Sequence, residues 1–219
     1  MKKLAVTLLI AGYSVAALAQ DNTSTIQLRH IYHYIFTDFV QGIVIKKTGN
    51  PVSVLLNYNT ITEEMIFEIN GQRLALDQLE NIDTVYMGGK IFTPVGKVFY
   101  ERATNTPVAL YIQHKSNVIP PSKREGYDGN TETGDVTTVA SFANNMGKFY
   151  MLTLPEDYKL ADRTVYWLKK DSGFIKITNL NSVTAAFPDK AEVIKTFAKA
   201  NKLNLNNADD LTKLIEFCN

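Results

Sequence analysis

The chain has one cysteine, almost no net charge and, beyond its first residues, no long apolar run. Because Cys218 is the only cysteine among 219 residues, no disulfide can form within one chain, and the fold depends on its core alone. The formal net charge of +1 at pH 7 lacks the basic excess that favours nucleic-acid binding. No later run of about 18 apolar residues is present, so we expect no membrane span in the mature chain.

Sequence motifs of common enzymes and metal sites are also missing. No Gly-x-Ser-x-Gly segment is present, which excludes the nucleophile elbow of serine hydrolases. His30 and His33 form an H-x-x-H pair, but Ile31 stands where a zinc metalloprotease carries glutamate. Aromatic and β-branched neighbours favour a strand there, on which residues three apart point to opposite faces. We therefore predict no metal site at this pair.

An oxygen-rich segment near residue 130 has some features of a calcium loop. In the register of an EF-hand, its essential glycine would fall on Thr133 and its closing glutamate on Val139, so an EF-hand is excluded. We predict no cofactor, no metal and no catalytic residue. The segment remains our candidate for partner binding, through Tyr127, Asp128, Asn130, Glu132 and Asp135.

Residues 1–19 have the three parts of a secretory signal peptide. Lys2 and Lys3 are followed by an apolar stretch and by the small-x-small sequence Ala17-Leu18-Ala19. Removal of this segment would leave 21 basic and 22 acidic side chains. We expect an exported protein that resides in the periplasm, at the outer membrane or outside the cell.

Residues 20–180 have the pattern of an antiparallel β domain. Val52, Val54, Leu56 and Tyr58 alternate with polar residues, as in a half-buried strand. Turn sequences such as Asn70-Gly71 recur at short intervals and favour antiparallel pairing. A long irregular segment, 116–147, interrupts this pattern, and we expect a mobile surface loop that proteases cut first.

Residues 181–219 change to a helical period. Pro188 is predicted to begin one helix and Asn207 to cap another. The second helix carries an apolar stripe at i, i+3, i+4 and i+7, made of Leu211, Leu214, Ile215 and Cys218. We therefore predict an α+β fold in which an antiparallel sheet, curled as an open barrel or a sandwich, packs against two to three C-terminal helices.

His114, Glu63 and Glu64 are further ionisable residues that we consider as candidates for acid–base chemistry. His114 shares the strand parity of Leu110 and Ile112, which favours a histidine at the edge of the core. Glu63 and Glu64 are adjacent, so on a strand they would face opposite sides and form no catalytic pair.

Several segments carry a resemblance to a known group of proteins. They are Leu56 to Thr60, Thr62 to Phe67, Asp83 to Tyr86, Ile91-Phe92 with Pro94, Phe99 to Glu101, and the ending Leu214 to Asn219. The chain resembles a family of uncharacterised exported proteins of Bacteroidota-type bacteria, and the similarity spans most of the mature chain. The resemblance implies that the protein belongs to the cell envelope of a Gram-negative bacterium, and it implies no particular activity.

Together these patterns favour a non-catalytic envelope or secreted protein that binds a protein partner, with an outer-membrane assembly as one setting for that binding. Two alternatives stay open. A small-molecule carrier needs an internal apolar cavity, and a glycan-directed hydrolase needs converging carboxylates in a cleft. The oligomeric state is not specified by the sequence.

The cleavage site gives a first testable prediction. We expect the mature protein to begin at Gln20, because Ala17-Leu18-Ala19 follows an apolar core of signal-peptide length. N-terminal sequencing of protein from the envelope and culture-medium fractions measures this directly. Retention of Met1 on most molecules in those fractions would contradict the signal-peptide interpretation.

Overall fold

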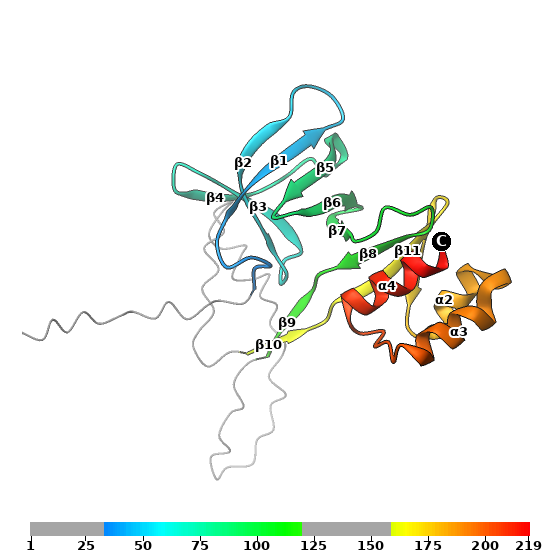
Figure 1. The fold of residues 1–219 in the computed structure, drawn as a ribbon. Helices are drawn as coiled ribbons and strands as arrows, with labels where there is room; N and C mark the ends of the chain where they lie inside the picture. The colour runs from blue at the N-terminus through cyan, green and yellow to red at the C-terminus, as the bar shows by residue number, and fades with distance from the viewer. Residues whose placement is uncertain (1–32, 120–158) are drawn as a thin grey trace, which may run out of the picture.

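The computed structural model describes residues 33–119 and 159–219, in which strands precede helices (Figure 1). The strands are β1 (Val40–Lys46), β2 (Val52–Asn59), β3 (Glu64–Ile69), β4 (Gln72–Ala75), β5 (Ile82–Met87), β6 (Lys90–Val95), β7 (Val98–Arg102), β8 (Ala109–Gln113), β9 (Ser116–Ile119), β10 (Lys159–Asp162), β11 (Val165–Lys170) and β12 (Gly173–Ile177). The helices are α2 (Leu180–Ala186), α3 (Ala191–Ala200) and α4 (Ala208–Cys218), with short 3-10 turns η1 (Leu79–Asn81) and η2 (Pro188–Lys190).

One antiparallel sheet of ten strands dominates the fold. Its strand order is β12-β11-β8-β7-β6-β5-β1-β2-β3-β4, and a separate pair joins β9 to β10. Most neighbours in the sheet are also neighbours in sequence, so short turns connect them, as the closely spaced turn sequences predict. The described part of the chain thus confirms the predicted α+β class and its antiparallel sheet.

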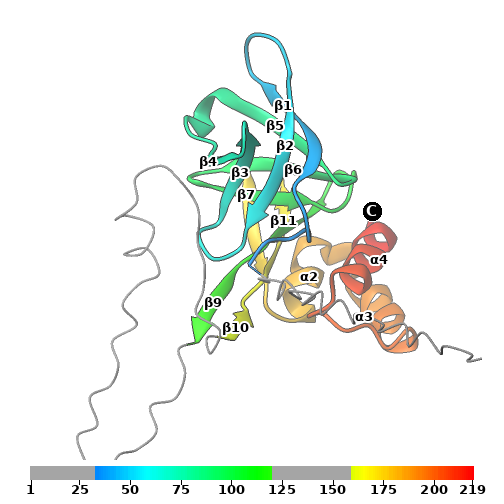
Figure 2. The same cartoon turned by 90° about the vertical axis from the view of Figure 1, so that its left-hand side faces the viewer.

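The sheet curls strongly but does not close into a barrel (Figure 2). The Tyr58 hydroxyl donates a hydrogen bond of 3.2 Å to the carbonyl of Phe99, which connects β2 to β7. The backbone N–H of Ser116 donates over 2.8 Å to the carbonyl of Thr60, so the β2–β3 turn contacts the start of β9. The sheet is thus open or sandwich-like, as the sequence predicts.

The turn between β5 and β6 shows why glycine is needed at a predicted turn. Gly88 and Gly89 both have positive φ, at 55° and 75°. The Phe36 ring also occupies the space beside Gly88, because a Cβ atom there would lie 2.3 Å from its Cζ atom. A larger residue at position 88 would therefore meet both backbone strain and a steric clash.

Capping side chains fix the starts of two helices. Asn179 and Ser182 form a reciprocal capping box at α2. The Asn207 side chain accepts a hydrogen bond from the backbone N–H of Asp210 over 3.0 Å, which confirms the predicted cap of α4. Helix α2 spans seven residues from Leu180.

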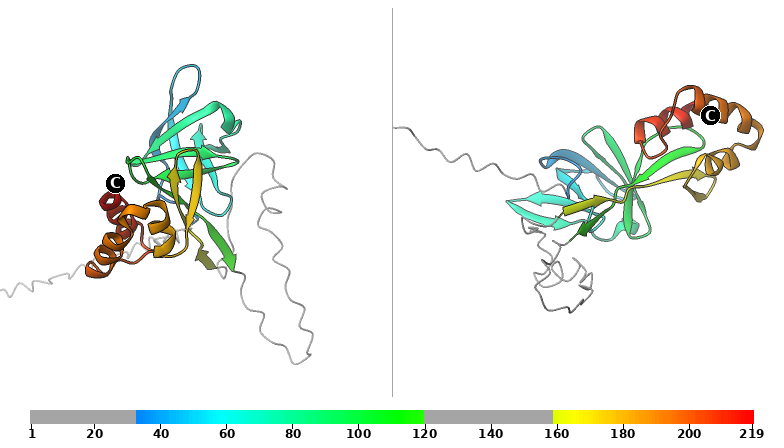
Figure 3. Two further views of the ribbon diagram at one scale, coloured as in Figure 1. Left: turned by 90° about the vertical axis from the view of Figure 1, so that its right-hand side faces the viewer. Right: turned by 90° about the horizontal axis from the view of Figure 1, so that it is seen from below.

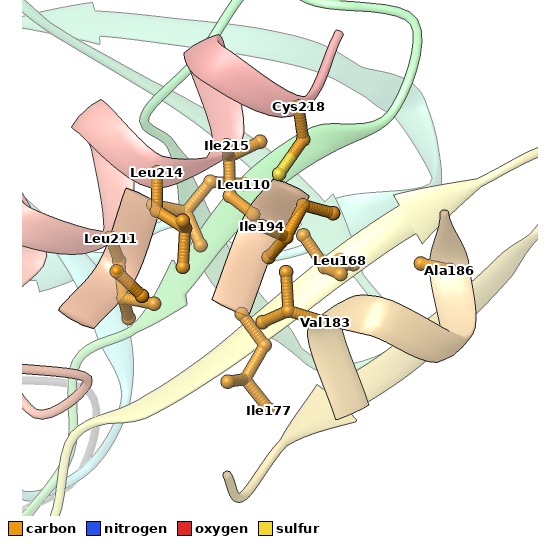
Figure 4. Packing of buried hydrophobic residues seen from close by; sticks show 11 residues of the cluster. Leu110, Leu168, Ile177, Val183, Ala186, Ile194, Leu211, Leu214, Ile215 and Cys218 are labelled. Atoms are coloured by element: carbon orange, nitrogen blue, oxygen red, sulfur yellow. The ribbon is translucent and has the colours of Figure 1, made fainter. Parts of the chain in front are cut away.

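The three helices cover one end of the sheet, beside β8, β11 and β12 and away from β1 to β4 (Figure 3). The predicted stripe of α4 faces this end, and all four of its side chains are fully buried. They pack with Leu110 and Leu168 from the sheet and with Val183 and Ile194 from the other helices (Figure 4). The helices therefore belong to the folded core, as the stripe predicts.

A second apolar cluster fills the curl of the sheet at the other end. Its largest fully buried members are Tyr58, Phe92, Phe99, Leu56 and Met65. The rings of Tyr58 and Phe92 stack with centroids 5.8 Å apart. The interior of the curl is therefore occupied by side chains.

The structure corrects one detail of the irregular segment predicted over 116–147. Its first four residues are strand β9, which pairs with β10 in the register Ser116↔Asp162 to Ile119↔Lys159. The paired residues lie 40 to 46 positions apart in the chain, so no short sequence window contains this pairing. The rest of that segment, with the expectation of mobility, lies outside the described residues.

The burial of α4 leads to a stability prediction. Leu214→Ala should lower the free energy of unfolding by about 2–5 kcal/mol, because the leucine is fully buried and its removal leaves a cavity. Urea unfolding followed by circular dichroism measures the change. Val193→Ala on exposed α3 surface is the control and should cost less than about 0.5 kcal/mol. Equal stability of the Leu214 variant and the wild type would show that α4 does not contribute to the core.

Candidate functional site

A buried carboxylate lies between the two apolar clusters, on the inner face of the sheet. Cross-strand pairing places Glu101 beside Phe92 on one side and Ile112 on the other. The Lys90 ammonium donates to Glu101 Oε1 over 2.7 Å, and His114 Nε2 lies 2.6 Å from Oε2. Burial alone would raise the pKa of Glu101, but these two partners outweigh it and hold the pKa below its ordinary value.

A second polar network joins the β2–β3 turn to β8. Glu63 accepts a hydrogen bond of 2.6 Å from the Gln113 amide and one of 2.8 Å from the Lys115 ammonium. Gln113 in turn accepts a bond of 3.2 Å from the Trp167 indole. Contrary to the sequence expectation, Glu63 does not lie on a strand, because it occupies the turn with a left-handed φ of 56°.

Whether the carboxylates of these two networks are available for catalysis depends on how many of their oxygens are hydrogen-bonded. Each oxygen of Glu63 and of Glu101 has a nitrogen donor within hydrogen-bond distance. A carboxylate whose two oxygens are both hydrogen-bonded to neighbouring side chains connects the elements that carry them. A glycoside hydrolase, in contrast, presents its two carboxyl groups to the substrate in an open cleft. We therefore interpret both networks as structural ion pairs.

His114 takes the place that strand parity predicts, at the edge of the core. Its ring lies 6.4 Å from the Tyr58 ring and 6.3 Å from the Phe92 ring, with its Nε2 on Glu101. A carboxylate that orients a histidine is also part of a catalytic triad, but a triad needs a nucleophile within reach of the second ring nitrogen. The described contacts of His114 include no serine, threonine or cysteine side chain.

The H-x-x-H pair is only half described, because His30 lies outside the described residues. His33 is 2% exposed, and its ring lies 4.2 Å from the Tyr34 ring. Neither of its ring nitrogens has a hydrogen-bond partner within the described ranges. Burial, with a smaller contribution from the positive charge of Arg73, lowers the pKa of His33 to about 4. His33 is thus a neutral, buried side chain at neutral pH.

Other candidate residues are placed as follows. Cys218 is fully buried on α4, and burial raises its thiol pKa to about 11, so it is a poor nucleophile. Within residues 33–119 and 159–219, no three His, Cys, Asp or Glu side chains gather in a way that would hold a metal ion.

The predicted partner-binding residues lie outside the described ranges, and their role stays a prediction. They are Tyr127, Asp128, Asn130, Glu132 and Asp135.

A shallow apolar groove of about 470 Å³ lies on the outside of α3 and α4. Val193 is 57% exposed and Phe217 is 41% exposed, although both are large apolar residues. The Phe197 and Phe217 rings stack with centroids 3.8 Å apart and form the contact between the two helices. The remaining lining residues are Glu192, Thr196, Ala200 and Asn201. We call this surface the α3–α4 groove.

Sequence reasoning did not identify this groove. Helical spacing predicts one apolar stripe on α3, made of Ala191, Ile194, Phe197 and Ala198. Phe197 packs against the buried cluster that contains Ile194, and it also stacks on Phe217. The available signal was Val193, an apolar residue beside the buried Ile194 and therefore outside the stripe. Val193 becomes part of a surface only because Phe217 of α4 lies exposed beside it, which the sequence of α3 alone does not contain.

A second exposed apolar row crosses the outer face of the sheet. Ile43 of β1 pairs with Tyr86 of β5, and Tyr86 pairs with Ile91 of β6. Ile43 is 42% exposed and Tyr86 is 45% exposed. This row is flat, because its side chains project from neighbouring strands of one sheet face.

No protein-family model, curated protein or solved structure matches this chain to a significant degree. Within the part of the chain that the structure describes, none of the helices has the length and apolarity needed to cross a membrane. The function must therefore be inferred from the surfaces and side chains themselves.

The buried histidine predicts how stability depends on pH. The unfolded chain binds a proton at His33 near pH 6.5, whereas the folded chain binds it near pH 4. Between these values the unfolded state holds more protons, so stability falls as the pH falls, by up to about 3 kcal/mol from this residue. Urea unfolding of wild type and His33→Gln at pH 7 and pH 4 measures the difference.

We expect the stability loss on acidification to be smaller in His33→Gln than in the wild type. Glu101 acts in a separate window: its lowered pKa contributes stability that is present above its ordinary pKa and is lost as the pH falls below it. That loss should be common to both proteins. Parallel pH curves for the two proteins would show that His33 titrates normally in the folded state.

Proposed function

We propose that this chain is an exported, non-catalytic protein of the cell envelope or the exterior, and that it binds a protein partner in the α3–α4 groove. The observation that carries the proposal is the exposure of Val193 and Phe217 around a hollow apolar surface. Exposed apolar surfaces of this kind mark interaction sites, since water would otherwise disfavour them. Export rests on the N-terminal segment and remains part of the proposal.

The alternatives receive less support from the described residues. A small-molecule carrier would need an apolar cavity within the curl, but that space is filled by Tyr58, Phe92 and Phe99. A glycan-directed hydrolase would need converging carboxylates that face substrate, but Glu63 and Glu101 are engaged with lysine, histidine and amide donors. The apolar groove on the helices has no role in either alternative.

The dimensions of the groove favour one amphipathic helix of the partner as its occupant. Helix α3 has ten residues and is about 15 Å long, which matches two to three turns of a docked helix. Its border carries both charge signs, because Lys195 and Glu192 form an ion pair of 2.7 Å. An apolar floor with a polar border is the surface that helix-in-groove recognition uses.

A permanent dimer of this chain is less well supported by the same surface. Two strongly exposed apolar side chains contribute at most roughly 200 Å² each, whereas a stable interface buries about 800 Å² on each partner. The hollow suits a single anchoring side chain of a partner, which is how small interfaces concentrate their binding energy.

The test compares two matched substitutions in the full-length protein. Val193→Glu places a charge in the α3–α4 groove, and Ile43→Glu places the same charge on the flat row of the sheet. Both positions carry exposed β-branched residues, so neither change should lower the melting temperature by more than about 2 °C. Each protein is tagged, produced in its native host and crosslinked in intact cells before purification.

We expect one protein to be recovered in stoichiometric amount with the wild type and with Ile43→Glu, and to be lost with Val193→Glu. The purified partner, or a peptide covering its amphipathic helix, should then bind the wild type at least about tenfold more tightly than Val193→Glu. Loss with Ile43→Glu alone would move the interface to the sheet. Equal behaviour of all three proteins, or the recovery only of a second copy of the chain, would overturn the proposal.

A further inference from the structure

A larger groove, of about 630 Å³, crosses the outer face of the sheet at one end of the strands. It extends from Lys47 after β1, across β5, β6 and β7, to Tyr111 of β8, Lys169 of β11 and Phe174 of β12. None of these residues belongs to the α3–α4 groove. We call this surface the cross-strand groove.

Two cations stand at one end of the cross-strand groove, on either side of one tyrosine. Arg102 is the direct cross-strand partner of Tyr111. The Lys169 ammonium lies 5.8 Å from the centre of the same ring and 5.9 Å from that of Phe174. Direct and diagonal neighbours on one sheet face are within reach of each other, so both cations lie near the same tyrosine.

Neither cation is neutralised by an acidic side chain within the described ranges. Arg102 donates from Nε to the Thr104 carbonyl over 3.2 Å and from its terminal nitrogen to Asn105 Oδ1. These neutral acceptors hold the guanidinium in place and leave its charge available. A guanidinium that is held in place and not ion-paired, with a lysine on the other side of the same tyrosine, offers the positive charge that a carboxylate or a phosphate requires.

The rest of the groove combines apolar side chains with hydroxyl groups, and acidic side chains lie at its far end. Thr93 of β6 and Thr84 of β5 line the middle, and the Thr84 hydroxyl donates to Asp83 Oδ2 over 2.9 Å. Glu80 and Asp83 line the end near Lys47. Threonine hydroxyls and carboxylates are the groups that bind ligand hydroxyls, so the ligand should carry hydroxyl groups beyond its anion.

We propose that the cross-strand groove binds a small hydroxylated anion whose carboxylate or phosphate is held by Arg102 and Lys169. The hydroxyl-bearing part of the ligand extends over Thr93 toward Asp83. The volume suits a ligand of one or two sugar-sized units rather than a macromolecule. This proposal is independent of partner binding at the α3–α4 groove.

Titration calorimetry at low and moderate salt tests the proposal with three sugars of similar size. Glucuronate carries a carboxylate, glucose 6-phosphate carries a phosphate, and glucose carries neither. We expect at least one of the two anions to bind with a dissociation constant below about 1 mM and to weaken as salt increases. Glucose should show no binding up to about 10 mM.

Matched charge-removing variants locate the site. Arg102→Gln and Lys169→Gln should each weaken anion binding by about tenfold. Lys176→Gln removes the same charge from an exposed position on β12, opposite Trp167 and outside the lining of the groove, and should change the affinity less than about twofold. All three variants should keep the far-UV circular dichroism spectrum of the wild type.

The single tryptophan provides a second, local readout. Trp167 is the cross-strand partner of Tyr111 and stacks on Tyr100 at 5.9 Å, so a bound anion near Tyr111 should change its fluorescence. Binding of neither anion up to about 10 mM would overturn the proposal. Glucose binding as tight as that of the anions, or an equal loss in Lys176→Gln, would do the same, because general surface charge would then explain the result.

Discussion

The ion pairing of Glu101 is the constraint on which the two halves of this fold depend. Its carboxylate lies on the inner face of the sheet, between the cluster in the curl and the cluster under the helices. A buried carboxylate without partners is costly, but Lys90 and His114 reach it from β6 and from the end of β8. The three side chains therefore fix how β6, β7 and β8 lie relative to each other at the point where the two apolar clusters meet.

Several other charged side chains are also engaged in ion pairs within the fold. Glu63, Glu101, Lys90 and Lys115 are paired with each other or with His114. The groups that are left to interact with other molecules are apolar side chains on α3 and α4 and the cations of the cross-strand groove.

Local patterns predicted the fold well and the surfaces poorly, for a physical reason. The stripe from Leu211 to Cys218 was predicted because helical spacing alone places those residues on one face, and the structure confirms their burial. His114 was likewise placed at the core edge by strand parity. Its partner Glu101 was not predicted, because their contact depends on the register between β7 and β8 rather than on either strand alone.

The candidate sites depend on such long-range contacts even more strongly. Whether Phe217 is covered or exposed is decided by the angle between α3 and α4, which no short sequence window contains. Arg102 and Lys169 are 67 positions apart and meet only because β8 and β11 pair across a long intervening segment. Glu63 was misplaced on a strand because its left-handed backbone is unusual for a residue other than glycine.

An open sheet has two edges, and each edge of this one is poorly suited to pairing with another chain. At one edge, β4 has only four residues, and its Arg73 is held by Glu68 and lies 4.5 Å above the Phe39 ring. At the other edge, β12 carries Lys176 near its centre and leads directly into capped helix α2. Short length, inserted charge and an adjoining helix all oppose edge-to-edge polymerisation. The protein therefore keeps an open sheet without the aggregation hazard that an unprotected edge would bring at high local concentration.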